Sequence, residues 1–560
     1  MTQIANKNDS VPKAISESYR LVRYFPFLIL LFVFLFSFGT KISVLDVGAP
    51  YVTIDDGTKY EGGFHVWFGQ APPQRMYIES WISGISSIAT YVVRNVGQEG
   101  VLGLNLIADA YRDFRANPDP YVLSYRSVML FVDFLTAVLV FLLAKEVARR
   151  HSEANWIAVI AASLYLLSFN TLWAYVVARP DTLTAFFAVA GLLLYYRSGF
   201  GQHQKTLILS GVILGLATGM KLHGAFFVIF ICLDLWRQVG FKEAVRRALW
   251  FGIVSVLAFS VSAGSVIFDP ALYIKLRLLN ARDDASPWLE WGDQFVTLLR
   301  GTGWLVVPLI ITLIGVVHRL PKLKGDPKLI SVIFLSILWL LLFASLRVLR
   351  GYWMLPALPL FYIASAFTLV HLARSYLRLV ALVLLFGVFS IQLWQEGKAF
   401  RDVPFNELRS WVVQNVEPDQ TIYILGYTAL NLPLNTSAIQ KYKQVLESGF
   451  AEAVTNGESF TMRHIRLWEE RANYRLLDML NFQSATGYRY FGYNSFSPDV
   501  MEKLIAFENV DYIFLQAHFQ IADEEQLAAL VATEYELLIS LTGPGGGGYG
   551  LSYDVYKRKE

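Results

Sequence analysis

The stretch Phe25-Pro-Phe-Leu-Ile-Leu-Leu-Phe-Val-Phe-Leu-Phe-Ser-Phe38 decides the fold class of this chain. It holds no charged residue, and with its flanks it supplies the roughly 20 mostly apolar residues that a membrane-spanning helix needs. The basic residues that precede it are Lys7, Lys13, Arg20 and Arg23. Because an excess of Lys and Arg marks the cytoplasmic side of a span, we expect the chain to begin in the cytoplasm and to emerge near Lys41.

The composition of the whole chain points the same way. Of its 560 residues, 55% are hydrophobic and 15% are aromatic, which is too apolar for a soluble protein of this size. The formal net charge of +3 is small and the basic residues are spread over short loops, which argues against a nucleic-acid partner. The single cysteine, Cys232, excludes an intrachain disulfide and a Cys-based metal site.

Further apolar stretches predict that the chain crosses the membrane about eleven times. They cover residues 121–144, 155–175, 182–196, 206–220, 224–236, 249–267, 302–317, 329–346, 354–371 and 377–394. This threading makes every cytoplasmic loop basic, as the positive-inside rule requires. It also keeps residues 77–93 on the outer surface, where their mix of Ser, Trp and Tyr with Glu79 is typical of an interfacial helix.

The predicted fold class is therefore a polytopic α-helical membrane protein with interfacial helices in the first outer loop and a C-terminal soluble α/β domain. The expected parts are a cytoplasmic tail (1–24), a transmembrane domain (25–396, with the first outer loop at 39–120) and an extracytoplasmic domain (397–560). An odd number of spans places that domain on the periplasmic or extracellular side of the plasma (inner) membrane. Within it we expect strands at 421–425 and 510–515, helices at 405–415 and 523–533, and an edge strand at 550–557.

Under this threading, polar clusters from separate segments all reach the outer face. They are Asp55-Asp56, Arg179-Pro180-Asp181, Lys221 with His223, Asp283-Asp284, and Arg347 with Arg350. A carboxylate near the apolar boundary is partly desolvated, which raises its pKa toward the range of a general base. Each cluster also has a simpler interpretation: a solvated turn at Asp55-Asp56, a helix cap at Asp181, or a snorkelling side chain at Lys221.

Cations beside the bilayer on the outer face run against the orientation rule, and a phosphate at headgroup depth is their natural counter-charge. The cations concerned are Arg126, Arg179, Lys221, Arg347 and Arg350. Asp133 lies in the middle of a predicted span and stands apart from them. Intramembrane carboxylates are rare and often functional, although Asp133 can also simply pair with a neighbouring helix.

These elements, in this order, resemble the GT-C superfamily of membrane glycosyltransferases, in the branch of protein O-mannosyltransferases and lipid A aminoarabinose transferases. The matching motifs are Asp55-Asp56, Gln70-Ala-Pro-Pro-Gln-Arg75, Arg126 at the start of a span, Ala178-Arg-Pro-Asp181, Gly215-Leu-Ala-Thr-Gly-Met-Lys221, and Tyr352 to Pro359. The resemblance extends over about residues 20 to 395. The family often has Asp-Glu where this chain has Asp55-Asp56.

The resemblance implies transfer of a hexosyl or pentosyl group from a polyprenyl-phosphate donor to an acceptor glycan, lipid or protein, with inversion. Asp55 is then the general base, with Asp56 and Asp181 as further catalytic candidates. Cations stabilise the leaving phosphate, and the donor-binding candidates are Arg126, Arg179, Lys221, His223, Arg347 and Arg350. Some relatives bind a divalent cation, but no ligand spacing in this chain predicts its position.

Two other functions share parts of this pattern. A transporter or lipid flippase would carry an internal repeat and polar residues at the middle of several spans. A polysaccharide polymerase or ligase would concentrate its charge in one large outer loop. The sequence shows neither a repeat nor such a loop, so we expect a glycosyltransferase, with the sugar and the acceptor left open.

Overall fold

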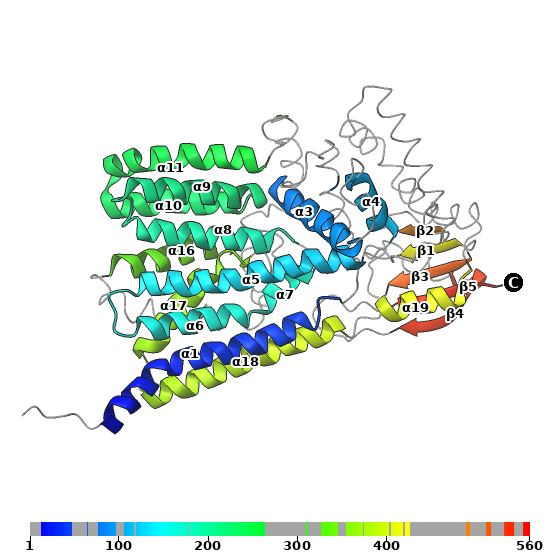
Figure 1. The fold of residues 1–560 in the computed structure, drawn as a ribbon, viewed down its shortest axis with the longest axis horizontal. Helices are drawn as coiled ribbons and strands as arrows, with labels where there is room; N and C mark the ends of the chain where they lie inside the picture. Colours follow the sequence, from blue (N-terminus) through cyan, green and yellow to red (C-terminus); the bar gives the residue numbers. More distant parts are fainter. Residues whose placement is uncertain are drawn as a thin grey trace, which may run out of the picture.

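The computed structural model describes residues 13–46, 64, 77–96, 106–116, 119–176, 179–263, 271, 308, 310–311, 326–344, 354–372, 375–401, 405–417, 421–425, 489–492, 511–516, 531–541 and 553–559. Figure 1 shows helices lying side by side in a bundle and strands gathered beyond one end of it. The helices of the bundle are α1 (Lys13–Ile42), α5 (Asp119–Val147), α6 (Ala154–Leu166), α7 (Phe169–Val176), α8 (Asp181–Arg197), α9 (Gln204–Met220), α10 (Gly224–Val239), α11 (Phe241–Ser262), α16 (Pro327–Ala344), α17 (Leu358–Leu372) and α18 (Ser375–Arg401).

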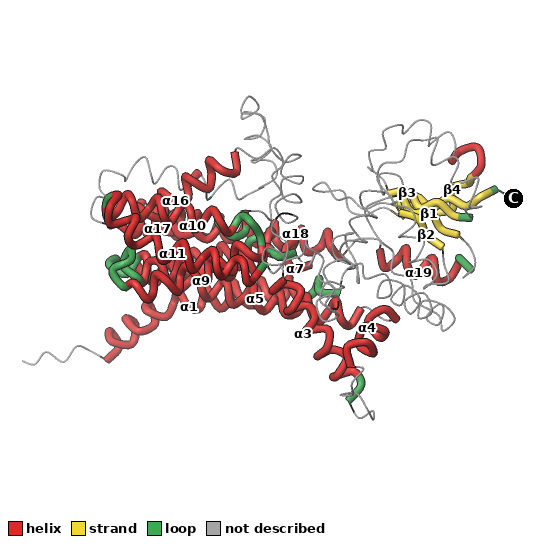
Figure 2. The backbone as a smooth tube through the Cα atoms, turned by 90° about the horizontal axis from the view of Figure 1, so that it is seen from above, coloured by secondary structure: helices red, strands yellow, loops and turns green. Residues whose placement is uncertain are grey.

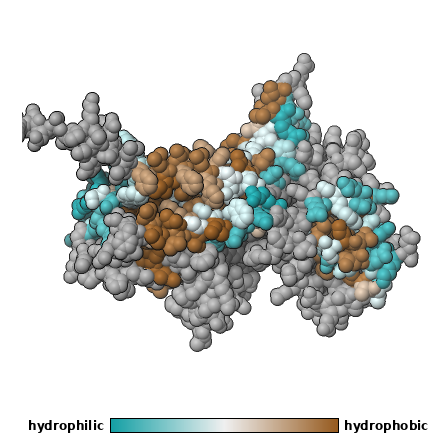
Figure 3. All heavy atoms as spheres, turned by 90° about the horizontal axis from the view of Figure 1, so that it is seen from below, coloured by the Kyte–Doolittle hydropathy of each residue, from teal (hydrophilic) through white to brown (hydrophobic). Residues whose placement is uncertain are grey.

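The bundle turns apolar side chains outward, as a protein surrounded by lipid does. Phe32 of α1 is 72% exposed and Leu384 of α18 is 63% exposed. Figure 3 shows the resulting hydrophobic band across the helical part of the molecule. Among the described residues, four helices are long and apolar enough to cross a membrane, and a bent pair adds a fifth candidate. Contiguous apolar surface on this scale marks contact with a membrane, so the chain is a multi-pass membrane protein.

The predicted spans largely coincide with described helices, and one of them is broken. Residues 155–175 are predicted to form a span, and the structure builds this stretch from two helices, α6 and α7, bent by 50°. At the break the Ser168 N–H donates to the Tyr165 carbonyl at 3.1 Å, and the Thr171 hydroxyl donates to the Ser168 carbonyl at 2.8 Å. The predicted span 302–317 lies mostly outside the described residues, so the full count of about eleven spans stays a prediction.

The bundle has two distinct ends, and the predicted outer and inner loops fall on different ones. The "sheet end" is the end toward the strands, where α1 ends, α8 begins and α9 turns into α10 (Figures 1 and 2). The "far end" holds the connections 148–153, 198–203 and 240, together with the start of α16. All described loops that the threading places in the cytoplasm lie at the far end. The direction of the bundle across the membrane stays a prediction.

Two helices of the first outer loop lie at the sheet end: α3 (Tyr77–Arg94) and α4 (Leu106–Ala116). α3 contacts α5 and α9, and its burial is the reverse of that in a soluble protein. Ser83 and Ser87 are buried (0% and 3% exposed), whereas Ile85 and Val93 are open (57% and 72%). A polar face against protein and an apolar face outward is the arrangement expected of a helix that lies in lipid.

The C-terminal residues form a mixed five-stranded sheet of order β2-β1-β3-β5-β4. Its strands are β1 (Thr421–Leu425), β2 (Arg489–Gly492), β3 (Tyr512–Gln516), β4 (Tyr535–Leu541) and β5 (Tyr553–Arg558). β1 pairs in parallel with β2 and β3, and β5 pairs antiparallel with β3 and β4. The helix α19 (Phe405–Asn415) packs on the sheet, since the Trp411 ring lies 6.0 Å from that of Tyr512.

The sequence prediction for this sheet is right in part. The strands at 421–425 and 510–515 and the helix at 405–415 are present, while the predicted helix 523–533 lies mostly outside the described residues. The tail forms a strand as expected, but the prediction that it is an edge strand is wrong. β5 is bonded on both sides, and Tyr553 and Val555 are fully buried. Alternating apolar residues indicate a strand without indicating how many neighbours it has.

Candidate active site

The turn between α9 and α10 presents Lys221 at the sheet end. Lys221 ends α9 with an extended backbone (φ −155°, ψ 134°), and its N–H still donates to the Ala217 carbonyl at 3.1 Å. The chain then reverses within three residues, and the Gly224 N–H donates back to the Lys221 carbonyl at 2.8 Å. Because the turn is so tight, the positions of the Lys221 Cα and Cβ atoms are fixed by the backbone.

Glycines make this turn and the helix behind it possible. A Cβ at Gly224 would lie 2.4 Å from the Thr218 nitrogen, so only glycine lets the turn fold back onto α9. Along α9, Gly211, Gly215 and Gly219 recur every fourth residue and let α11 approach closely. A Cβ at Gly219 would lie 1.6 Å from the Ser262 Oγ. Small residues at this spacing allow close packing of membrane helices.

Asp181 is the first residue of α8, and it is the partner of Lys221. The Lys221 Nζ lies 2.6 Å from the Asp181 Oδ1, joining the start of α8 to the end of α9. Helix dipoles favour this arrangement, because a carboxylate stands at a helix N-terminus and an ammonium at a helix C-terminus. Asp181 makes no side-chain cap of α8, whose N-cap residue is Pro180.

The two side chains of this pair differ in their solvent exposure. The Asp181 side chain is 1% exposed, whereas the Lys221 side chain is 18% exposed. The second Asp181 oxygen, Oδ2, is buried without a hydrogen-bond partner among the described residues. An ammonium has three donors. Lys221 therefore has the chemistry to hold Asp181 and to contact an anion that approaches from the sheet end.

The other predicted donor-binding residues divide into described and undescribed groups. Arg126 is fully buried on α5 and donates from Nη1 to the Leu45 carbonyl at 2.9 Å, just beyond the end of α1. Arg179 is half-buried, and its backbone N–H donates to Ala174. His223 directly precedes α10 in the same turn as Lys221. Outside the described residues lie Asp55, Asp56, Asp283, Asp284, Arg347 and Arg350.

Sequence reasoning left Asp133 without an assigned partner, and the structure supplies one. The Lys41 Nζ lies 2.6 Å from the Asp133 Oδ2, and both side chains are buried (0% and 1% exposed). The Tyr165 hydroxyl donates to the other Asp133 oxygen at 3.0 Å. The sequence does hold a signal for this partner. Lys41 is a cation at the outer end of a span, where the positive-inside rule does not favour one.

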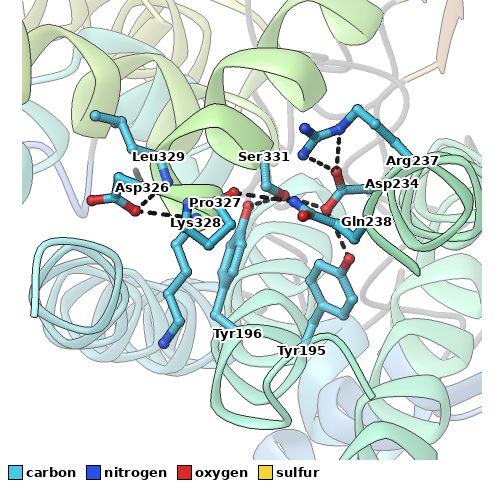
Figure 4. Close-up of polar contacts among 10 residues, drawn as sticks. All are labelled: Tyr195, Tyr196, Asp234, Arg237, Gln238, Asp326, Pro327, Lys328, Leu329 and Ser331. Carbon is cyan, nitrogen blue, oxygen red and sulfur yellow. Dashed lines mark hydrogen bonds and ion pairs between the residues drawn. The ribbon is translucent and has the colours of Figure 1, made fainter. Parts of the chain in front are cut away.

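A second polar network that the sequence did not predict lies at the far end (Figure 4). Asp234 of α10 is fully buried and accepts hydrogen bonds from Tyr195, Ser331 and Arg237. One carboxylate thereby joins α8, α10 and α16. Figure 4 also shows Asp326, whose Oδ1 accepts the Lys328 and Leu329 N–H groups at the start of α16. These contacts are satisfied within the protein, and we assign them a structural role.

The predicted divalent cation has no ligand set within the described parts of the chain. There, no three His, Cys, Asp or Glu side chains gather in an arrangement that could hold a metal ion. Asp55 and Asp56 fall outside those parts, so a cation bound by them stays a prediction.

The comparisons with known proteins concern the same segment as the Lys221–Asp181 pair. The family model "Dolichyl-phosphate-mannose-protein mannosyltransferase" matches residues 109–282, which contain Arg126, Asp181 and Lys221. This multi-pass membrane protein is thus similar, over that segment, to the protein O-mannosyltransferase branch of the GT-C glycosyltransferases. The resemblance that the sequence motifs predict is confirmed.

Two solved structures match the chain over nearly its full length. One is ArnT from Cupriavidus metallidurans in the apo state, at 11% identity and a TM-score of 0.44, covering 94% of this chain and 97% of that one. The other is the same protein bound to undecaprenyl phosphate, at 11% identity and a TM-score of 0.45, covering 95% and 97%. No curated protein matches the chain.

Proposed function

We propose that the protein transfers a sugar from a polyprenyl-phosphate donor to an acceptor at the outer face of the membrane. The observation that carries this proposal is the Lys221–Asp181 ion pair, held at one end of an apolar bundle inside the segment that the family model matches. That family is named for a dolichyl-phosphate sugar as donor, and dolichyl phosphate is a polyprenyl phosphate. A lipid-anchored phosphate would lie near the helix ends, where this cation stands.

The reaction that fits is a single displacement with inversion at the anomeric carbon. The acceptor hydroxyl oxygen attacks that carbon while the bond to the donor phosphate breaks, and Asp55 accepts the hydroxyl proton. The phosphate leaves with the bonding electrons and so gains negative charge. Lys221 then stabilises that charge electrostatically.

Asp181 has a supporting role in this mechanism. In the absence of lipid it neutralises the Lys221 ammonium and holds it at the sheet end, where it competes with an incoming phosphate for that charge. When phosphate arrives, the ammonium can contact both anions, because it carries three donors and is 18% exposed. Arg126, Arg179, His223, Arg347 and Arg350 stay candidate contacts to the same phosphate, and Asp56 stays a candidate partner of Asp55.

Mass spectrometry of lipids retained by the gently purified protein tests the phosphate site. We expect a polyprenyl phosphate, or its sugar conjugate, in the wild-type protein and its loss in Lys221→Ala. The matched control is Lys328→Ala, because Lys328 forms a comparable ion pair with Glu146 at the far end (side chains 23% and 15% exposed). Equal retention of the polyprenyl lipid by all three proteins would contradict the site.

The base is tested by Asp55→Asn, assayed with whichever donor lipid copurifies. We expect transfer to be abolished while the lipid is still retained and the thermal midpoint is unchanged. Retained lipid with undiminished transfer would remove Asp55 as the base. Vectorial movement of the lipid across vesicles, without cleavage of its sugar, would instead favour the transporter function.

A further inference from the structure

The end of α1 is fixed by polar contacts from several other helices. Lys41 in its last turn is ion-paired to Asp133 of α5 at 2.6 Å, and the Tyr175 hydroxyl of α7 donates to the Lys41 carbonyl at 2.6 Å. The next residues are held as well, because Arg126 donates to the Leu45 carbonyl and Arg401 of α18 donates to the Ser43 hydroxyl. This is a dense set of directional contacts at the point where the chain leaves the bundle.

Most of the rest of α1 packs through apolar side chains, although the buried Ser37 hydroxyl also donates to the Leu166 carbonyl of α6 at 2.7 Å. Its apolar face consists largely of Phe and Leu residues, several of which are exposed, including Leu28 and Phe32. Apolar contacts are not directional, so a wrong register costs them less than it costs a buried charge. A shift by one residue moves a helix by about 1.5 Å along its axis and turns it by about 100°. A shifted register would break the Ser37 and Tyr175 hydrogen bonds, and it would above all separate Lys41 from Asp133, which leaves buried charges without a partner.

Stability alone does not account for a fully buried ion pair. Taking both charges out of water is costly, and replacing such a pair with apolar residues of similar volume is often neutral or stabilising. A buried polar pair that sets a unique register is the best-attested alternative reason for its presence. Here the wrong register would leave Lys41 and Asp133 buried apart, each without its counter-charge.

We propose that Lys41 and Asp133 are positioning residues for glycosyl transfer: their ion pair fixes the register of α1 and so the place from which the first outer loop starts. The inference rests on the proposed function, because that loop carries the proposed base, Asp55. Neither residue touches the donor or the acceptor. They act by fixing the end of α1 relative to the α9–α10 turn that carries Lys221.

A distance measurement between spin labels tests this directly. The single cysteine is replaced (Cys232→Ser), and labels are attached at Asp46→Cys, just past α1, and at Leu222→Cys, in the α9–α10 turn. We expect one narrow distance distribution in this background and at least a twofold broader one in Lys41→Met with Asp133→Leu. The matched control, Lys328→Met with Glu146→Leu, removes an ion pair at the far end and should leave the distribution narrow.

Further readouts separate positioning from general damage to the fold. The apolar double variant should keep the wild-type thermal midpoint and the wild-type affinity for added undecaprenyl phosphate, while turnover of the copurifying donor falls at least tenfold. The single variant Lys41→Arg, which keeps the charge, should recover most of the turnover and the narrow distribution. If the double variant does not fold, Asp133→Asn removes the charge with minimal change of shape and should also broaden the distribution.

The outcomes are distinguishable from failure of the proposed function. A narrow distribution in both the double variant and Asp133→Asn overturns the positioning role, whatever the lipid measurements show. Broadening in the far-end control to the same extent overturns it too, because the effect is then not specific to the end of α1. Failure of wild-type protein to bind undecaprenyl phosphate would count against the proposed function and leave the distance result standing.

Discussion

Lys41 and Asp133 are 92 residues apart in the chain, yet the ammonium of one contacts the carboxylate of the other at 2.6 Å inside the bundle. Lys221 and Asp181 form a second pair at the same distance. The two pairs differ in exposure, since neither Lys41 nor Asp133 is open to a ligand while Lys221 is 18% exposed. That difference separates a pair suited to fixing helices from a pair suited to contacting a phosphate.

The Lys221–Asp181 pair holds two charges whose separate removal should change phosphate binding in opposite directions. Lys221→Gln removes the cation and should weaken undecaprenyl phosphate binding at least tenfold, about 1.4 kcal/mol. Asp181→Asn removes the competing anion and should strengthen binding severalfold, because phosphate no longer competes with a carboxylate for the Lys221 ammonium. Calorimetric titration in detergent measures both. Weaker binding in both variants would show that Asp181 acts on the lipid in some other way.

Tyr165→Phe should destabilise the protein more than Tyr195→Phe. Each variant removes a hydroxyl donor from a buried carboxylate, at a cost of about 1–3 kcal/mol when the acceptor is left unsatisfied. Asp133 then retains Lys41, whereas Asp234 retains both Ser331 and Arg237. Thermal midpoints in detergent give the ranking. A larger loss for Tyr195→Phe would contradict the assignment of these networks.

Gly219→Ala should impair both stability and lipid retention, whereas Gly252→Ala should do neither. The new Cβ at position 219 would lie 1.6 Å from the Ser262 Oγ, and such overpacking typically costs about 1–3 kcal/mol. It would also push α11 away from α9 next to the Lys221 turn. Position 252 on α11 has no atom within 4 Å of an added Cβ. Equal midpoints for the two variants would refute the close α9–α11 contact.

The inverted burial of α3 predicts its surroundings. In the Cys232→Ser background, a spin label at Ile85→Cys should be accessible to oxygen, which concentrates in lipid, more than to a water-soluble nickel complex. A label at Ser87→Cys should be shielded from both relaxation agents, since Ser87 is 3% exposed and faces the protein. Preferential access of the nickel complex to position 85 would place α3 in water.

Much of the framework follows from sequence because its causes are local. Long apolar runs predicted the helices of the bundle, and the basic loops assigned the ends of α5, α8 and α10 to one side. The motif Gly215 to Lys221 is visible in the sequence. The structural reason for its glycines is the close approach of α11, which lies in a different segment of the chain. The strand at 553–558 was found from alternation, but its inner place in the sheet was not.

By itself, then, the sequence determined that the chain is a multi-pass membrane protein with cations gathered near the ends of its spans. The bilayer requires each span to be apolar and favours basic residues in each cytoplasmic loop. Because these requirements apply to one segment at a time, they are visible in the local sequence. Only the tertiary structure decided that Lys221 meets Asp181 and that Lys41 meets Asp133. Each contact joins helices whose mutual rotation depends on how the whole bundle packs, and no single segment carries that information.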